Sequence, residues 1–298
     1  MLENLLTEQV NPDAADLDKL PTQQMLERIN REDRTVAEAV AREIPAIAKA
    51  VDAIAEVLER GGRLFYIGAG TSGRLGVLDA SECAPTFGVS PSQVQAIMAG
   101  GVEALYQSCE AVEDDAEAGA RDLLERGFTA RDALVGIAAS GRTPYVLGAI
   151  AAARKMGALT AGISCAPGSE LSRMVDFPIQ PATGAEIVAG STRLKAGTAT
   201  KLVLNMISTG VMIRLGYVFG NLMVNLAPSN EKLVDRARRI IAAAARIDYN
   251  RAAELLEASG HQAGVAIYMA LRNATREEAE RRLAAAGGRL RRALEETH

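Results

Sequence analysis

Short apolar runs alternate with helix-length amphipathic segments through the middle of the chain. The runs are Arg63–Ile67, Val94–Met98, Ala133–Ala138 and Leu159–Ser164. Runs this short and continuously apolar are typical of strands buried on both faces, and parallel strands need a crossover helix between them. The alternation therefore predicts an α/β fold, a doubly wound parallel sheet flanked by helices.

Helical patterns surround this predicted sheet. A long amphipathic helix is predicted over Thr35–Arg60, with Thr35 as its N-cap. The segment Thr192–Leu215 is apolar nearly all round, which indicates a buried helix or a helix at a subunit interface. Short helices rich in Ala, Arg and Glu follow, so we expect two domains: residues 1–244, with an N-terminal helical segment, and residues 245–298, a small helical bundle.

Composition narrows the classes of function. The chain has 298 residues, a net charge of −4 with the two signs interspersed, and only 4% aromatic residues, which argues against nucleic acid as a partner. No uncharged apolar run approaches the ~18 residues that a membrane span needs, so we expect a cytoplasmic protein. The three cysteines match neither a disulfide framework nor a zinc pattern.

Two similar turns each end a strand and begin a helix: Ser72-Gly73-Arg74 and Ser140-Gly141-Arg142. Ligands of open α/β sheets bind beyond the carboxyl ends of the strands, where helix N-termini offer free N–H groups to an anion. We therefore predict an anion site formed by both turns. Its candidate residues are Gly70, Thr71, Ser72, Ser140, Gly141 and Thr143.

The arginine in each turn has two interpretations. A cation in the first turn of a helix is disfavoured by roughly 0.3–1 kcal/mol unless it meets an anion or an acidic side chain. Arg74 and Arg142 could therefore face a bound anion, or pair with surface carboxylates. The sequence does not decide between these.

A dinucleotide site is disfavoured, although Gly68, Gly70 and Gly73 form a literal G-x-G-x-x-G. Such a site needs an acidic residue about 20 positions further on, at the end of the second strand. The nearest acid, Glu103, lies thirty residues past Gly73, and neither turn is followed by the Gly-Lys-Ser/Thr of an ATP site. The paired turns therefore indicate a monophosphate.

Carboxylates must supply any proton transfer. The chain has two histidines, His261 and His298, and neither is predicted near the sheet, which also argues against a Ser-His-Asp triad or a metal site. Glu82 and Glu113 follow the first and second strands and could return to the turns. Each could instead be a solvated surface acid.

The stretches that carry these residues resemble one enzyme family. YIGAGTSGRLGVLDASECAPTFGV, GIAASGRTPYV, GSTRLKAGTATKLVLNMISTG and GNLMVNL are similar to those of N-acetylmuramic acid 6-phosphate etherases, essentially end to end. The resemblance implies a sugar isomerase (SIS) fold and a cytoplasmic homodimer with active sites near the subunit boundary. It also implies cleavage of the lactyl ether of N-acetylmuramic acid 6-phosphate during peptidoglycan recycling, with no cofactor and no metal.

The resemblance also implies residue roles. Glu82 matches the family's general acid, Glu113 its second essential glutamate, expected to be the base, and the two turns its phosphate site. A protonated Glu82 would need a raised pKa, for which we expect partial burial. Ala138 departs from the serine of many SIS proteins, which puts one phosphate hydrogen bond in doubt; Ala84 departs from the E-C-P-P pattern, without an expected consequence.

Two other functions share this fold. A sugar-phosphate isomerase would use the same turns and a glutamate base but needs no acid aimed at carbon 3. A non-catalytic sensor is the second alternative, since the glucokinase regulatory protein looks similar, but the presence of both glutamates favours catalysis. The roles of Glu186 and Lys195 stay open between orienting the substrate and forming a buried structural pair.

Overall fold

The computed structural model describes residues 6–107, 112–226, 228 and 230–295. The chain divides into two compact units, Met1–Ser81 with Ser92–Ser208, and Glu82–Pro91 with Thr209–His298. The second unit thus takes up more of the chain than residues 245–298, where the sequence predicted the helical bundle.

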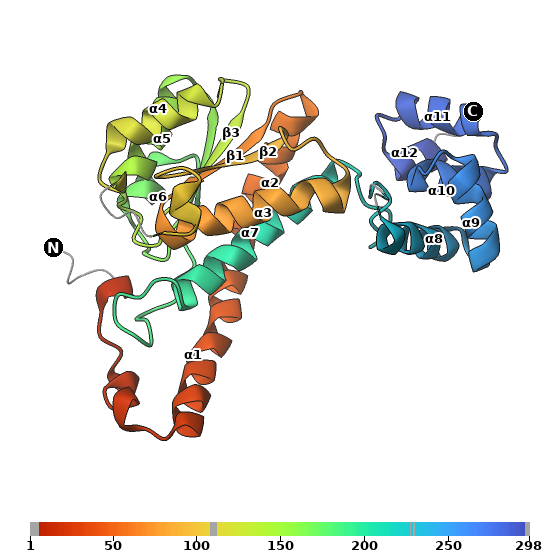
Figure 1. The fold of residues 1–298 in the computed structure, drawn as a ribbon. Helices are drawn as coiled ribbons and strands as arrows, with labels where there is room; N and C mark the ends of the chain where they lie inside the picture. The colour runs from red at the N-terminus through yellow and green to blue at the C-terminus, as the bar shows by residue number, and fades with distance from the viewer. Residues whose placement is uncertain (1–5, 108–111, 227, 229, 296–298) are drawn as a thin grey trace. The chain divides into compact units, whose positions relative to one another are not determined.

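The first unit is built on a parallel sheet of five strands in the order β2-β1-β3-β4-β5. Helices α4, α5 and α6 cover one face, and α2, α3 and α7 begin on the other (Figure 1). This confirms the predicted doubly wound α/β fold. The strands are β1 (Leu64–Gly68), β2 (Val94–Met98), β3 (Ala133–Ile137), β4 (Leu159–Ile163) and β5 (Phe177–Ile179); the helices are α2 (Ile44–Glu59), α3 (Gly70–Phe87), α4 (Ala116–Glu125), α5 (Pro144–Lys155), α6 (Glu170–Met174) and α7 (Lys195–Arg214).

Successive side chains of β1 point to opposite faces, as the period of a strand requires. Phe65 and Ile67 are buried in the apolar cluster formed with α4 and α5. Tyr66 faces α3 and donates its hydroxyl to Asp79 Oδ2 at 2.9 Å. Asp79 also accepts from Asn205 and Ser208 of α7, and burial raises the pKa of its carboxyl above the usual value. This buried polar cluster ties α3 and α7 to the sheet.

Helices α4 and α5 pack with their backbones in close approach. An ideal Cβ at Gly119 would lie 1.8 Å from the Tyr145 carbonyl oxygen, and one at Gly148 would lie 2.0 Å from that of Ala116. Only glycine leaves room for this crossing. Asp115 caps α4 by accepting from the Ala118 N–H at 2.9 Å, so the residues just before α4 are held beside the start of α5.

The predicted helix over Thr35–Arg60 is wrong in its start and in its continuity. Helix α1 runs from Thr22 to Arg42, and α2 begins at Ile44 after a break at Glu43. Thr35 lies inside α1, where its hydroxyl donates to the Glu32 carbonyl. The break has a direct cause, because Pro45 in the first turn of α2 has no N–H to continue the hydrogen bonds of α1.

Besides the ends of α3 and α7, the described residues of the second unit form five whole helices: α8 (Glu231–Ala245), α9 (Tyr249–Ala258), α10 (Ala263–Arg272), α11 (Arg276–Ala285) and α12 (Leu290–Glu295). Three of them begin where a side-chain oxygen accepts from the first turn, at Asn230, Asp248 and Thr275. Their apolar faces form one core that includes Ile241, Leu256 and Ile267. The helices that share this core begin at α8.

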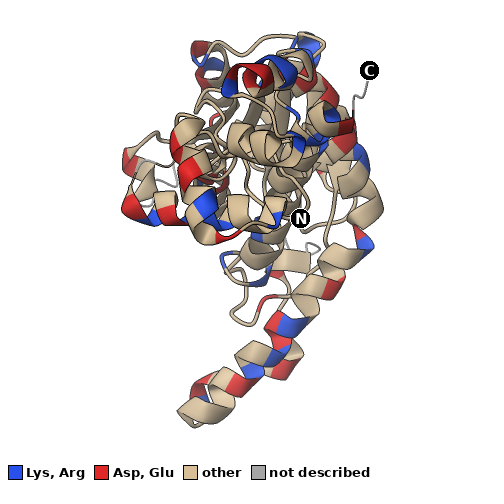
Figure 2. Cartoon of the chain, turned by 90° about the vertical axis from the view of Figure 1, so that its right-hand side faces the viewer, with Lys and Arg blue, Asp and Glu red and all other residues tan. Residues whose placement is uncertain are grey.

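Acidic and basic residues are interspersed along the same helices, most visibly along α1 (Figure 2). Within the described ranges, the structure contains no helix with the length and apolar character needed to cross a bilayer.

Candidate active site

The two predicted turns leave neighbouring strands at the carboxyl edge of the sheet. Gly68 at the end of β1 pairs in register with Ile137 at the end of β3. Helix α3 begins two residues after β1, so Thr71 and Ser72 lie in its first turn. Ser140 and Thr143 lie between β3 and α5, and all four hydroxyl-bearing residues are partly exposed. The structure therefore places the hydroxyls of the predicted anion site in adjacent turns.

The second turn has a tight internal structure. Gly141 has φ +64°, and an ideal Cβ there would lie 2.3 Å from Ser169 Oγ, so only glycine can occupy this position. Its carbonyl accepts from the Leu171 N–H at 2.9 Å, and Ser169 is in turn hydrogen-bonded to Ser164 at 2.9 Å. Sequence reasoning missed both serines, although the position of Ser164 directly after β4 places it at the same sheet edge.

Glu113 lies between the starts of α3 and α5. Its carbonyl accepts from the Tyr145 N–H at 3.0 Å, which fixes its backbone at the second residue of α5. Its Oε1 lies 3.0 Å from the position that an ideal Cβ would take at Gly70, the first residue of α3. The half-buried Glu113 carboxylate thus lies beside the first turn, which carries the Thr71 and Ser72 hydroxyls. The main chain of Glu113 is held by α5.

The first turn of α7 lies against the same region. An ideal Cβ at Gly197 would be 3.6 Å from Thr71 Cγ2, so the space between α7 and the first turn would hold little more than one methyl group. Glu186 accepts from the N–H groups of Lys195 and Ala196, each at 2.9 Å. The Lys195 ammonium pairs with Glu32 at 2.6 Å. The side chains of Glu186 and Lys195 therefore do not form the buried structural pair that was one of the two possibilities left open by the sequence.

Among the residues that the structure describes, neither arginine of the repeated turns pairs with a carboxylate, the partner considered from the sequence. Arg74 donates to the main-chain carbonyls of Ala104 and Leu105, at 2.7 and 3.0 Å. It therefore fastens the loop after β2 to α3, and its place in the first turn of α3 needs no bound anion to explain it. Arg142 is exposed.

Glu82 lies on α3, ten residues beyond Ser72, and its side chain is exposed. The neighbouring Cys83 and Phe87 take the buried face of the helix. The partial burial expected for Glu82 is therefore not found within a single chain. In the second unit, Gly88 lies close to the main chain of Asn225, because an ideal Cβ at Gly88 would lie 2.0 Å from the Asn225 carbonyl oxygen.

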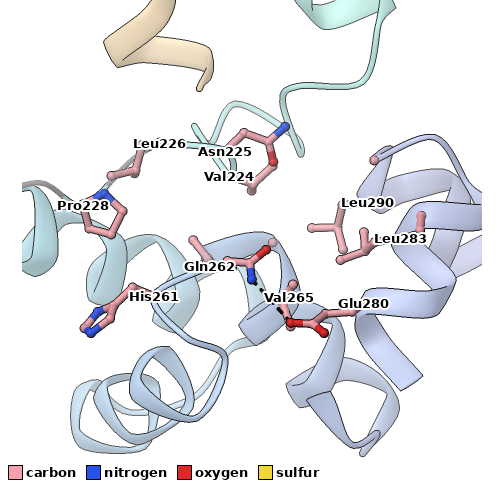
Figure 3. Close-up of a pocket in the computed structure, with 14 residues that line it drawn as sticks. Val224, Asn225, Leu226, Pro228, His261, Gln262, Val265, Glu280, Leu283 and Leu290 are labelled. Carbon is pink, nitrogen blue, oxygen red and sulfur yellow. Dashed lines mark hydrogen bonds between the residues drawn. The ribbon is translucent and has the colours of Figure 1, made fainter. Parts of the chain in front are cut away.

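A separate cavity of about 540 Å³ lies in the second unit (Figure 3). Its walls are mainly apolar, with Val224, Leu226, Leu283 and Leu290 among them, and Gln262 donates to Glu280 at one side. The described residues that line it include the start of α10, at Gln262 and Ala263, but no serine or threonine hydroxyl. We therefore take the turns and Glu113 as the candidate active site.

Comparison with known proteins decides the family. The N-acetylmuramic acid 6-phosphate etherase of Rubrobacter xylanophilus is 54% identical over 295 residues, covering 99% of this chain and 97% of the relative. The chain belongs to the N-acetylmuramic acid 6-phosphate etherase family. The etherase of Clostridium beijerinckii is 50% identical over the same shares of both chains. The predicted resemblance is confirmed.

The SIS fold of this etherase family member has two further supports. Residues 46–154 match the model of the glucokinase regulatory protein N-terminal SIS domain, a range that contains both hydroxyl turns, Glu82 and Glu113. A Bacteroides fragilis protein described as a phosphosugar isomerase has a TM-score of 0.51 at 22% identity, covering 66% of this chain and 94% of its own. At that identity the likeness concerns the fold alone.

Proposed function

We propose that the chain is a carbon–oxygen lyase that cleaves the D-lactyl ether of N-acetylmuramic acid 6-phosphate during recycling of cell-wall amino sugars. The products are N-acetylglucosamine 6-phosphate and D-lactate. The full-length identity to etherases supports the reaction. The observation within the site that supports it is the Glu113 carboxylate beside Gly70, between two hydroxyl-bearing helix starts.

The 6-phosphate binds in the two turns. Helix α3 begins at the first turn, and the N–H groups of its first residues lack partners within the helix, so they are available to an anion. Helix α5 offers no such groups at the second turn, because Pro144 has no N–H and the Tyr145 N–H donates to the Glu113 carbonyl. The hydroxyls of Thr71, Ser72, Ser140 and Thr143 add donors around the phosphate oxygens. Gly70 and Gly141 allow the backbone to approach the ligand closely.

The reaction is an elimination followed by hydration. In the ring-opened sugar the C2 hydrogen is next to the aldehyde, so the Glu113 carboxylate can remove it as a proton. The C3–O bond then breaks, Glu82 protonates the departing lactyl oxygen, and an α,β-unsaturated aldehyde remains. Water adds at C3, its proton returns to the Glu82 carboxylate, and C2 is reprotonated. Each proton transfer from a positioned side chain contributes about 10²–10⁴-fold.

We further propose that the enzyme is a homodimer in which the partner's Glu82 serves each site. Ser72 and Glu82 are ten residues apart on α3, about 15 Å along its axis at the rise of an α-helix. Only a few bonds separate the 6-phosphate of a hexose from its carbon 3, so a phosphate at the start of α3 leaves carbon 3 distant from Glu82 of the same helix. A glutamate from a second copy removes this difficulty.

Exposed apolar side chains support the second copy. Leu78 of α3 is 51% exposed and Met206 of α7 is 40% exposed. Burial of such side chains against a partner is a favourable contribution of the kind that stabilises dimers. A cover of this kind would also enclose Glu82, which is exposed in a single chain. We place the enzyme in the cytoplasm, where the family resemblance puts it.

The test is release of D-lactate from N-acetylmuramic acid 6-phosphate in ¹⁸O-labelled water. The proposal requires lactate release and label at C3 of the sugar product, because hydration introduces the new C3 hydroxyl. Aldose–ketose conversion of a hexose phosphate without lactate release would identify an isomerase instead. Tight binding of the sugar phosphate without turnover would identify a sensor.

A further inference from the structure

We propose that Glu186 is a positioning residue that sets the phosphate affinity of the site by holding the first turn of α7 against both hydroxyl turns. The inference rests on the proposed function, because it concerns the same phosphate site. It resolves the open question about Glu186 and Lys195.

Glu186 is too deeply buried to touch a substrate itself. Its relative exposure is 0%, and both carboxylate oxygens accept backbone N–H groups, from Lys195 and from Ala196 at 2.9 Å. Hydrogen bonds from N–H groups to an ionised carboxylate are among the strong ones in proteins. The negative charge also lies at the positive end of the α7 dipole, where it is stabilised. Glu186 therefore fixes where α7 begins.

The turn of helix that Glu186 fixes contacts both halves of the phosphate site. On one side, Gly197 approaches Thr71 so closely that an ideal Cβ at Gly197 would be in van der Waals contact with Thr71 Cγ2, at 3.6 Å. On the other side, the Ala196 carbonyl is 3.8 Å from Cys165 Sγ, and the Cys165 N–H donates to the Ala139 carbonyl at 2.8 Å, next to Ser140. A shift of the first turn of α7 is therefore transmitted to Thr71 and to the backbone beside Ser140.

Lys195 adds a second fastening at the same point. Its side chain is the first of α7 and is 3% exposed, which would be unfavourable for an unpaired ammonium. The 2.6 Å pair with Glu32 supplies the counter-charge and joins α7 to α1. The first turn of α7 is thus held by two other elements, α1 and the loop that carries Glu186. This is the part of α7 that lies beside Thr71.

The test compares Glu186→Gln with Asp132→Asn. Asp132 is a matched control: it is buried and accepts two backbone N–H groups, from Arg63 and Thr129, but at the amino ends of β1 and β3, the opposite edge of the sheet. Both variants should lower the melting temperature. Only Glu186→Gln should weaken binding of N-acetylglucosamine 6-phosphate, measured by calorimetry, by roughly 10-fold, with the same rise in KM and a kcat within about 3-fold of the parent.

Lys195→Met provides a second variant, which keeps the backbone N–H that Glu186 binds and removes only the ion pair. It should weaken binding of N-acetylglucosamine 6-phosphate in the same direction but by less. Unchanged binding in both the Glu186 and Lys195 variants, with melting temperatures lowered as in Asp132→Asn, would overturn the inference. Because calorimetry needs no turnover, a chain that binds this sugar phosphate but releases no D-lactate would refute the proposed function and leave this test intact.

Discussion

The Glu113 carboxylate occupies the space beside Gly70 that a side chain would need. Its Oε1 is 3.0 Å from an ideal Cβ at Gly70, and the φ of Gly70 is +53°. Gly70→Ala should therefore displace Glu113 and strain the backbone, with a loss of about 1–2 kcal/mol in stability. We expect a fall in kcat well beyond what the lost stability explains, measured by D-lactate release at a temperature where the variant is fully folded.

Gly157→Ala separates strain from displacement of Glu113. Gly157 has φ +79°, and an ideal Cβ there meets nothing within 4 Å. This variant should show a similar loss of stability with an unchanged kcat. Equal losses of kcat in the two alanine variants would mean that the position of Glu113 does not limit the reaction.

Glu113→Gln should abolish the base while keeping the shape of the side chain. The expected loss in kcat is about 10²–10⁴-fold, with little change in affinity for N-acetylglucosamine 6-phosphate. The neighbouring Asp114 is exposed, so Asp114→Asn is the control and should retain parental turnover. Near-normal turnover of Glu113→Gln would remove Glu113 from the mechanism.

Asp132 should make stability depend on pH. Burial raises the pKa of its carboxyl, but hydrogen bonds from Arg63 and Thr129 outweigh burial and hold the pKa below its usual value. The group therefore adds stability above its unfolded pKa of about 4, and this contribution is lost as the pH falls through the lower, folded value. Asp132→Asn should be less stable than the parent by about 1–3 kcal/mol at neutral pH.

The measurement is urea unfolding of parent and variant from neutral pH to below about pH 4, the ordinary range of an aspartate pKa. The difference in free energy of unfolding should narrow as the pH falls through the pKa of Asp132. A difference that stays constant over this range would show that the Asp132 charge does not contribute to stability.

The strands could be predicted from the sequence because burial on both faces leaves an uninterrupted apolar signal. The run Val94–Met98 appears in the structure as β2. The run Ala133–Ala138 appears as β3, without its last residue. The first long helix could not be bounded in this way. The amphipathic pattern continues across Glu43, whereas the missing N–H of Pro45 breaks the helix there.

Part of the candidate site, the two turns at the ends of β1 and β3, could be predicted from the sequence. Glycines and hydroxyls at strand ends indicated both turns, and the structure has them on adjacent strands. Hydrogen bonds between residues far apart in the sequence could not be predicted, because the proximity of these residues depends on the fold. Examples are the bond that Arg74 donates to the Ala104 carbonyl and the bond that Glu186 accepts from the Ala196 N–H at the start of α7. The exposure of Glu82 in one chain likewise depends on tertiary packing.

The arrangement of the two glutamates can be tested with purified mixed dimers. Co-expression of Glu82→Gln and Glu113→Gln chains with different tags yields a dimer in which each chain lacks one glutamate. If the partner's Glu82 serves each site, one of the two sites is intact, because it takes its Glu113 from one chain and its Glu82 from the other. A dimer of parent and double-variant chains is the reciprocal control, since it then has no intact site.

The most direct measurement is D-lactate release from N-acetylmuramic acid 6-phosphate by these two dimers. The account predicts about half the parental rate for the dimer of single variants, as one of two symmetry-related sites works, and almost none for the reciprocal control. The opposite pattern, an inactive dimer of single variants and a half-active control, would contradict a site shared between subunits.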